Sequence, residues 1–241
     1  MKMDGEKTLV IIPAYNEENN IAKVVNQIRD CISDVDILVV NDGSEDKTEE
    51  VVLSMGERAI TLPYHMGYGV ALQTGFKYAL KNGYRYAIQI DGDGQHDPKD
   101  IHKLLKVVLD EKVDVAIGSR FLNGGRYKAP LIRRIGMLIF SYLTSLIIGQ
   151  RVTDPTSGYQ ALNKNAIRFY ASDYYPVDFP DADVIIMLHR AGLRIKEIPV
   201  TMYPNPNHKS MHGGLKPLYY IFKMFLSIFL TLLRKNPFQK E

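Results

Sequence analysis

The sequence predicts an α/β fold in which a mostly parallel sheet is flanked by helices on both faces. Two observations lead to this expectation. Short apolar runs alternate with segments of helical periodicity through the first half of the chain, and polar motifs follow several of these runs directly. Strands separated by helices pair in parallel, and such sheets bind ligands beyond the carboxyl ends of their strands. We therefore expect PAYNEE, NDGSED, DGDGQHD and GSRF to lie on one rim.

Five apolar runs are the predicted strands of the first half. They are Leu9–Ile12, Ile37–Val40, Ala59–Leu62, Tyr86–Ile90 and Val113–Ile117. The first helix follows from the i, i+3, i+4, i+7 spacing that begins at Ile21, and Asn16 is its predicted N-cap. Further helices are predicted over 47–55, 69–81 and 98–110, and the last of these is entered through Asp97-Pro98.

The second half of the chain is less regular. It predicts a largely apolar helix over 131–149, a loop over 153–162 that leads into a short strand, a helix over 181–191 and a strand over 194–200. The tail, 215–235, is apolar, but Lys223 leaves an uninterrupted run of about half the roughly 20 residues that a spanning helix needs. We expect an amphipathic helix in a membrane interface, or else a helix packed on the domain or on a second subunit. The predicted division is 1–212 for the main domain and 213–241 for the tail.

Composition limits the class of protein. With 241 residues and 46% hydrophobic residues, the chain has room for one large core. A single cysteine, Cys31, excludes a disulfide framework and fits a reducing compartment, and no signal peptide is expected because the first apolar run has only four residues. The net charge of +3 is unevenly placed, since 119–153 holds basic residues and no acidic one. Such stretches favour surfaces that meet anions.

The loop after the first strand excludes two common classes of nucleotide enzyme. A dinucleotide-binding enzyme places G-x-G-x-x-G there, but this chain has Pro13-Ala14-Tyr15-Asn16-Glu17. A P-loop lysine motif is also missing from the sequence. These absences count against NAD enzymes and NTPases.

Carboxylates follow two of the predicted strands. Asp42 follows the second, where it suits hydrogen bonds to a base or a ribose and equally suits a turn. Asp91 and Asp93 follow the fourth strand in IQIDGDGQHDP, and two carboxylates spaced i, i+2 on a turn converge on one hard cation. A cation there, its shell completed by diphosphate oxygens, neutralises charge on a leaving group.

Five motifs in register resemble the family 2 glycosyltransferases of GT-A fold, and most closely the dolichyl- or polyprenyl-phosphate sugar transferases. They are PAYNEE, NDGSED, DGDGQHDP, GSRF and TDPTSGY, and the resemblance covers about residues 7–235. It implies a Rossmann-like GT-A sheet and an Asp-x-Asp motif that holds Mg²⁺ or Mn²⁺ against a nucleotide-sugar.

The resemblance also implies a role for each matching residue. The matches to the nucleotide-sugar site are Pro13, Tyr15, Glu17, Asp42, Asp91, Ser119 and Arg120. The matches to metal ligands are Asp91, Asp93 and Gln95, while His96 is expected behind the ligands or in the turn. The acceptor-side matches are Asp154, Ser157 and Gly158. Asp93 and Arg120 belong to the implied catalytic set, together with Asp181 if the acceptor is a hydroxyl.

The likeness breaks down in the loop before the tail. The family often carries an arginine and then a glycine-x-serine there, whereas Asn205 and His208 stand at the aligned positions. Lys209 is the predicted substitute, because an ammonium group serves a phosphate as a point charge.

The segment DFPDAD, 178–183, bears on the acceptor. A hydroxyl acceptor needs a general base, for which Asp181 is the candidate, whereas a lipid phosphate is already anionic and needs none. The alternative is that these acidic residues only begin a helix, because negative charge at a helix N-terminus is favoured by the helix dipole.

The leading hypothesis is a metal-dependent, inverting transferase that moves a sugar from a UDP- or GDP-sugar to a polyprenyl or dolichyl phosphate. We expect peripheral association with the cytoplasmic face of a membrane, since the basic, apolar segment 120–151 and the basic tail suit anionic head groups. No nucleic-acid partner is expected, and a homo-oligomer is left open. The alternatives are a transferase acting on a saccharide hydroxyl in cell-surface polysaccharide synthesis, and a non-catalytic, membrane-tethered subunit that binds nucleotide-sugars.

Overall fold

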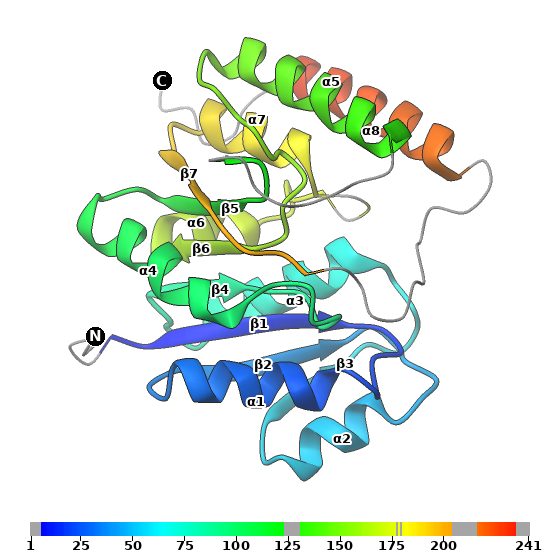
Figure 1. The fold of residues 1–241 in the computed structure, drawn as a ribbon, viewed down its shortest axis with the longest axis vertical. Helices are drawn as coiled ribbons and strands as arrows, with labels where there is room; N and C mark the ends of the chain where they lie inside the picture. The colour runs from blue at the N-terminus through cyan, green and yellow to red at the C-terminus, as the bar shows by residue number, and fades with distance from the viewer. Residues whose placement is uncertain (1–5, 123–130, 177, 179, 204–215, 235–241) are drawn as a thin grey trace.

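A seven-stranded sheet forms the centre of the computed structural model, which describes residues 6–122, 131–176, 178, 180–203 and 216–234. The strands are β1 (Thr8–Ala14), β2 (Asp36–Asn41), β3 (Arg58–Thr61), β4 (Tyr86–Gln89), β5 (Val115–Ser119), β6 (Gln160–Asn163) and β7 (Ile195–Pro199). Their order in the sheet is β3-β2-β1-β4-β6-β5-β7 (Figure 1). Only β6 runs antiparallel to its neighbours, β4 and β5, so the mostly parallel sheet is confirmed.

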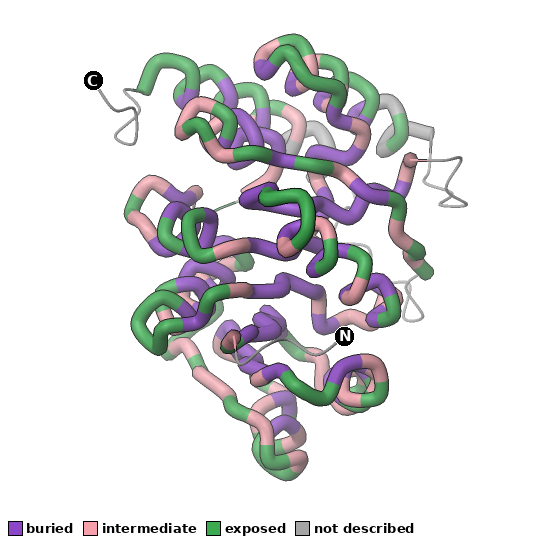
Figure 2. The backbone as a smooth tube through the Cα atoms, turned by 90° about the vertical axis from the view of Figure 1, so that its left-hand side faces the viewer, coloured by how far each residue is buried: buried purple, intermediate pink, exposed green. Residues whose placement is uncertain are grey.

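Helices cover both faces of this sheet. The helices are α1 (Ile21–Cys31), α2 (Thr48–Ser54), α3 (Tyr68–Lys81), α4 (Ile101–Asp110), α5 (Leu131–Ile148), α6 (Lys164–Tyr170), α7 (Ala182–Arg190) and α8 (Lys216–Leu233), and a short 3₁₀ helix, η1 (Pro98–Asp100), precedes α4. Alternation along β1 sends Val10 into a core with α1, α2 and α4, and Ile11 into a second core with α3 and α5–α8. Figure 2 shows the result as buried strands between helices that are exposed on their outer sides.

The predicted strands and helices are all present, with two local differences. Asn16 is not the N-cap of the first helix, which begins only at Ile21; it has a positive φ of 56°. Its side chain instead accepts a hydrogen bond from the backbone N–H of Glu45 at 2.9 Å, which ties PAYNEE to NDGSED. Helix α6 was not predicted, although Asn163 caps it by accepting from two backbone N–H groups. Asp97 caps η1 as predicted.

The tail helix α8 packs against α7, beside α5 (Figure 1). Met224 and Ile228 enter the core, and the Ser227 hydroxyl donates to the buried carboxylate of Asp183. The outer side of the described part of α8 leaves large apolar side chains exposed: Phe222, Phe225, Leu226, Phe229, Leu230, Leu232 and Leu233. Among the helices of the described residues, none is both long enough and apolar enough to cross a membrane. The division of the chain at residue 213 stays a prediction.

The packing of α8 predicts unequal effects for two of its aliphatic residues. Ile228→Ala should lower the free energy of unfolding by about 2–4 kcal/mol, because Ile228 is only 3% exposed and its loss leaves a cavity. Leu230→Ala, at a position 54% exposed, should change it by less than about 0.5 kcal/mol. Urea denaturation followed by circular dichroism measures both. Equal effects would show that α8 does not dock on the core in this way.

Candidate active site

The polar motifs meet at the carboxyl edge of the sheet. Ala14 at the end of β1 lies beside Asn41 at the end of β2, and both strands run parallel to β4 and β5. Strand β6 runs the other way, and its first residue, Gln160, pairs with Gln89 and Ile117. The loop before β6, TDPTSGY, therefore reaches the same edge. The rim expected from the sequence is confirmed, with this loop added.

Asp91 is held by hydrogen bonds on both of its carboxylate oxygens. Oδ1 accepts from the hydroxyl of Tyr68 at 2.8 Å, and Oδ2 accepts from Nε2 of His96 at 3.1 Å. Burial disfavours the ionised carboxylate, but these bonds and the charge of Arg120 outweigh it and hold the pKa of Asp91 below its ordinary value. Asp91 is therefore a fixed anion at the rim.

Asp93 has the opposite electrostatic character. Its Oδ1 accepts from the backbone N–H of Gln95 at 3.0 Å. Burial first, and then repulsion from the Asp91 carboxylate, raise the pKa of Asp93 from 3.8 to about 6. Two carboxylates this close, without a cation between them, resist full ionisation.

The residues after Asp93 are joined to the chain beyond β7. Gln95 donates its side-chain Nε2 to the carbonyl of Tyr203 at 3.3 Å, so its Oε1 is the atom left for a cation. His96 is 4% exposed and forms a β-bridge with Met202, behind Asp91. Its Nδ1 has no hydrogen-bond partner among the described residues. This agrees with the expectation that His96 stands behind the ligands.

A second group of residues lies at the ends of β1 and β2. The ring of Tyr15 stacks on that of His65, with centroids 3.9 Å apart. The buried carboxylate of Asp42 accepts from the backbone N–H groups of Met66 and Gly67 at 2.7 and 2.9 Å, and Nδ1 of His65 lies 2.9 Å from its Oδ2. Asp42 thereby holds the loop that leads into α3, and it supports the exposed Tyr15–His65 stack.

The strand end of PAYNEE completes this group. Pro13 is buried at the end of β1, and a Cβ on Gly92 would lie 3.2 Å from its carbonyl oxygen, so the Asp91–Asp93 turn passes close to β1. Glu17 accepts from the side chain of Asn20 at 2.6 Å, and its charge adds to the rise in the Asp93 pKa.

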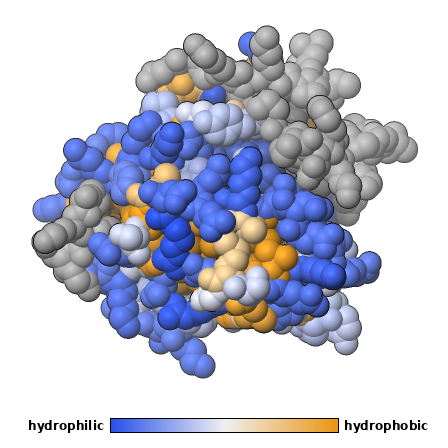
Figure 3. Space-filling view, turned by 60° about the horizontal axis from the view of Figure 1, so that its bottom comes forward, coloured by the Kyte–Doolittle hydropathy of each residue, from blue (hydrophilic) through white to orange (hydrophobic). Residues whose placement is uncertain are grey.

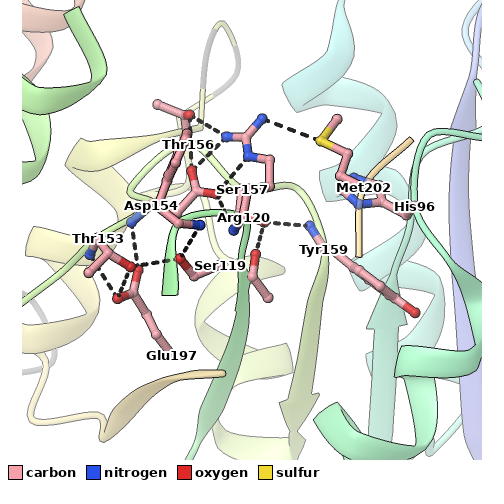
Figure 4. Close-up of polar contacts among 12 residues, drawn as sticks. His96, Ser119, Arg120, Thr153, Asp154, Thr156, Ser157, Tyr159, Glu197 and Met202 are labelled. Carbon is pink, nitrogen blue, oxygen red and sulfur yellow. Dashed lines mark hydrogen bonds and ion pairs between the residues drawn. The ribbon is translucent and has the colours of Figure 1, made fainter. Parts of the chain in front are cut away.

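Arg120 forms a buried ion pair with Asp154 (Figure 4). Its Nε and Nη2 donate to the two carboxylate oxygens at 2.6 Å each, and its backbone N–H donates at 3.0 Å. Nη2 also donates to Thr156 at 2.8 Å, and Nη1 lies 3.8 Å from the sulfur of Met202. Such a bidentate pair fixes the plane of the guanidinium group.

The other predicted residues of this loop also have partners inside the protein. Ser119 shares a 2.6 Å hydrogen bond with Thr153, and Ser157 donates to the carbonyl of Gly118 at 2.5 Å. Glu197 on β7 accepts from Thr153 and from the backbone N–H of Asp154 at 2.7 Å (Figure 4). Burial raises the pKa of Glu197. These contacts hold the TDPTSGY loop against β5 and β7.

Of the predicted site residues Asp181 and Lys209, only Asp181 lies within the described residues, beside Asp183. Asp183 is buried, accepts from Ser227 and from the backbone N–H of Asp181, and has a pKa raised by burial. Its oxygens are therefore used in joining α7 to α8. Asp181 is only partly buried and precedes α7. Lys209, the predicted substitute for the diphosphate clamp, lies outside the described residues, as do Asn205 and His208.

Three residues of the site were not predicted from the sequence: Tyr68, His65 and Glu197. Tyr68 lies in HMGYGVAL, just before the helix predicted over 69–81, where no local pattern marks a polar role. Glu197 carried the better signal, because it shares a strand face with the buried Ile195 and an acid at such a position has to find donors.

The donor set fits a magnesium or manganese ion that is shared with a ligand. Among the residues that the structure describes, no group of three or more His, Cys, Asp or Glu is arranged to hold a metal ion by itself. Mg²⁺ is usually held by one or two carboxylates and by substrate phosphates. The raised pKa of Asp93 beside Asp91 is the mark of a carboxylate pair that a cation would stabilise.

Comparison with known proteins agrees with this geometry. Residues 9–170 match the family model "Glycosyl transferase family 2". The chain belongs to glycosyl transferase family 2. It is therefore a glycosyltransferase, and the alternative of a non-catalytic subunit is not supported.

Relatives of this family 2 glycosyltransferase cover most of its length. It is 32% identical to UDP-N-acetylglucosamine–dolichyl-phosphate N-acetylglucosaminyltransferase of Methanococcus voltae, over 80% of this chain and 85% of the relative. It is 31% identical to polyprenol monophosphomannose synthase of Mycolicibacterium smegmatis, over 81% of this chain and 77% of the relative. A glucosyl-3-phosphoglycerate synthase of Mycobacterium tuberculosis, solved with Mn²⁺ and UDP-glucose, shares the fold with a TM-score of 0.66. The match covers 94% of this chain and 79% of that structure, at 19% identity.

The raised pKa of Asp93 predicts how the stability of this glycosyltransferase depends on pH. Without metal, the folded chain holds the Asp93 proton more tightly than the unfolded chain does, so the free energy of unfolding should fall as pH rises through the interval between the two pKa values, from about 4 to about 6. Asp93→Asn removes this loss. The variant should gain about 3 kcal/mol over the wild type above pH 6 and little below pH 4.

Urea denaturation in EDTA buffers across this pH range measures the difference. Asp110→Asn, at an exposed position, is the matched control and should follow the wild-type curve. A wild-type curve parallel to that of Asp93→Asn would contradict the raised pKa.

Proposed function

We propose that the chain transfers a sugar from a UDP- or GDP-sugar to a polyprenyl or dolichyl phosphate at a membrane surface. The observation that carries the proposal is the Asp91–Asp93 pair at the sheet rim, in a chain whose relatives are named for this transfer to lipid phosphates. An acceptor of this kind is anionic, so the reaction needs no general base on the protein.

The sugar donor would lie along the rim from β1 and β2 to β4. The exposed stack of Tyr15 on His65 offers an aromatic face to the base. Pro13, Glu17 and Asp42 shape this end, with Asp42 acting through the loop that it holds. The diphosphate would then reach Asp91 and Asp93.

Asp91, Asp93 and Oε1 of Gln95 would hold Mg²⁺ or Mn²⁺ against the diphosphate. When bound, this cation supplies positive charge that stabilises the departing nucleoside diphosphate. The acceptor's phosphate oxygen forms the new bond to the anomeric carbon while the bond to the diphosphate breaks, with inversion. His96 and Tyr68 keep Asp91 in place during this step, and Arg120 adds positive charge to the same side of the rim.

The acceptor would approach over the TDPTSGY loop. Asp154 and Ser157 serve this side through the contacts that shape the loop, Asp154 with Arg120 and Ser157 with Gly118. Ser119 supports the same loop through Thr153. Lys209 remains the proposed phosphate contact from the segment before α8.

The outer surface of α5 and α8 would rest on the membrane. Exposed apolar side chains gather on these two helices; on α5 they are Leu138, Ile139, Tyr142 and Leu146. The end of the molecule around α1 and α2 has instead a mostly hydrophilic surface (Figure 3). Peripheral association through α5 and α8 is supported by this asymmetry, and we propose that it takes place at the cytoplasmic face.

The first test is turnover with lipid phosphate. Wild-type protein with Mn²⁺, undecaprenyl phosphate and a panel of UDP- and GDP-sugars should release nucleoside diphosphate and form glycolipid. Asp93→Ala should lower the rate by about 10²–10³-fold, the usual cost of removing a preorganised electrostatic group. Asp34→Ala, an exposed carboxylate, is the control and should keep full turnover.

The same assay separates the two acceptors. Asp181→Asn should keep full turnover with undecaprenyl phosphate, because no proton has to be removed. If the wild type turns over a saccharide acceptor and folded Asp181→Asn does not, a hydroxyl acceptor with Asp181 as its base is favoured instead. If no sugar donor is used with any acceptor, the proposed transfer is wrong.

Membrane binding is tested separately. Phe222 and Phe229 are 63% and 57% exposed and lie seven residues apart on α8, so they share a face. The double variant Phe222→Ser, Phe229→Ser should bind vesicles of phosphatidylcholine and phosphatidylglycerol about tenfold more weakly or worse, since each exposed phenyl ring contributes burial energy. Cosedimentation measures this. Leu53→Ser on α2 is the control, and equal binding by all three proteins would rule out this surface.

A further inference from the structure

The hydroxyl of Tyr68 is directed at Asp91, while 36% of the residue is exposed. Tyr68 is the first residue of α3 and follows Gly67, whose φ of 102° turns the chain into the helix. Its hydroxyl donates to Oδ1 of Asp91 at 2.8 Å and accepts from Nε2 of Gln89 at 3.1 Å. Because the amide of Gln89 supplies a donor, the single proton of the hydroxyl is left for Asp91.

The side-chain amide of Gln89 is held in an orientation that leaves one of its polar atoms unsatisfied. Its Oε1 is buried without a hydrogen-bond partner among the described residues, and a buried amide oxygen ordinarily finds one. The reversed amide would present Oε1 to Tyr68 and compete with Asp91 for the hydroxyl proton. The observed arrangement therefore directs Tyr68 toward the carboxylate.

The carboxylate of Asp91 is enclosed on its remaining inner side as well. His96 donates to Oδ2 from the opposite direction at 3.1 Å. Gly158 lies so close that a Cβ there would be 3.2 Å from both carboxylate oxygens and 2.6 Å from the hydroxyl of Tyr68. One donor on each oxygen and a backbone wall leave a single orientation for the group.

We propose that Tyr68 is a positioning residue that works with His96 to fix the Asp91 carboxylate, so that its remaining lone pairs face the cation and the sugar donor. This rests on the proposed function. A phenol is suited to this role because it orients the carboxylate without neutralising it, as a lysine or arginine would. Groups that orient a metal ligand in this way contribute to metal affinity without touching the metal.

The test measures Mn²⁺ binding directly, by electron paramagnetic resonance of the free ion, with UDP or GDP present. Tyr68→Phe keeps the ring and removes only the hydroxyl, and it should weaken Mn²⁺ binding by about tenfold or more. Tyr64→Phe, in the same loop and with Tyr64 76% exposed, is the control and should bind as the wild type does. Turnover of Tyr68→Phe should recover at high Mn²⁺, as a change in the KM for metal predicts.

His96 supplies a second pair of variants. His96→Gln keeps a donor near Nε2 and should retain most of the affinity, whereas His96→Leu should lose about as much as Tyr68→Phe. Thermal denaturation without metal establishes that each variant is folded. If Tyr68 and His96 were merely structural, their variants would lower the thermal stability, and His96→Gln would not retain more Mn²⁺ affinity than His96→Leu.

The outcomes separate the two proposals. If Asp93→Ala abolishes Mn²⁺ binding while Tyr68→Phe leaves it unchanged, the positioning role is overturned and the proposed function stands. If Asp93→Ala itself leaves Mn²⁺ binding unchanged, the metal site of the proposed function fails, and the role of Tyr68 fails with it.

Discussion

The close contact between Gly158 and the Asp91 carboxylate is the constraint on which the site depends. It arises from β6, which runs backwards between β4 and β5 and so sends the loop before it across the carboxyl edge of the sheet. At that edge Asp91 follows β4, and only a residue without a side chain leaves its two oxygens undisturbed. The TDPTSGY loop and the Asp-x-Asp turn are therefore one unit, although about 60 residues separate them in the sequence.

The loop that makes this contact is held by buried charge. Arg120 and Asp154 are 4% and 0% exposed, and Glu197 binds the backbone of the same loop from β7. Removing one partner of such a pair costs about 3–5 kcal/mol, because the other charge is left buried, whereas replacing both with apolar groups is often neutral. The buried Arg120–Asp154 pair therefore adds little to the net free energy of unfolding, and its main effect is on the position of the loop. It fixes where the loop stands relative to Asp91.

The sequence was sufficient for the parts of the structure that local patterns determine. Apolar runs and helical spacing predicted the strands, and the polar ends of parallel strands predicted the rim. What it could not supply were partners distant along the chain. Nothing near Asp154 in the sequence indicates its ion pair with Arg120, 34 positions away. Asn16 looked like a cap, and Tyr68 had no local signal, because their partners Glu45 and Asp91 are determined by the packing of the sheet.

Helix α8 carries more large apolar side chains than its packing on the domain uses. Its inner side buries Met224 and Ile228, and its Ser227 hydroxyl donates to Asp183. Its outer side carries phenylalanines and leucines. A helix whose only task is to cover a core points its large apolar residues inward. An apolar surface outside the chain accounts for this arrangement, and a lipid bilayer that carries the acceptor provides one beside the rim where the sugar would be transferred.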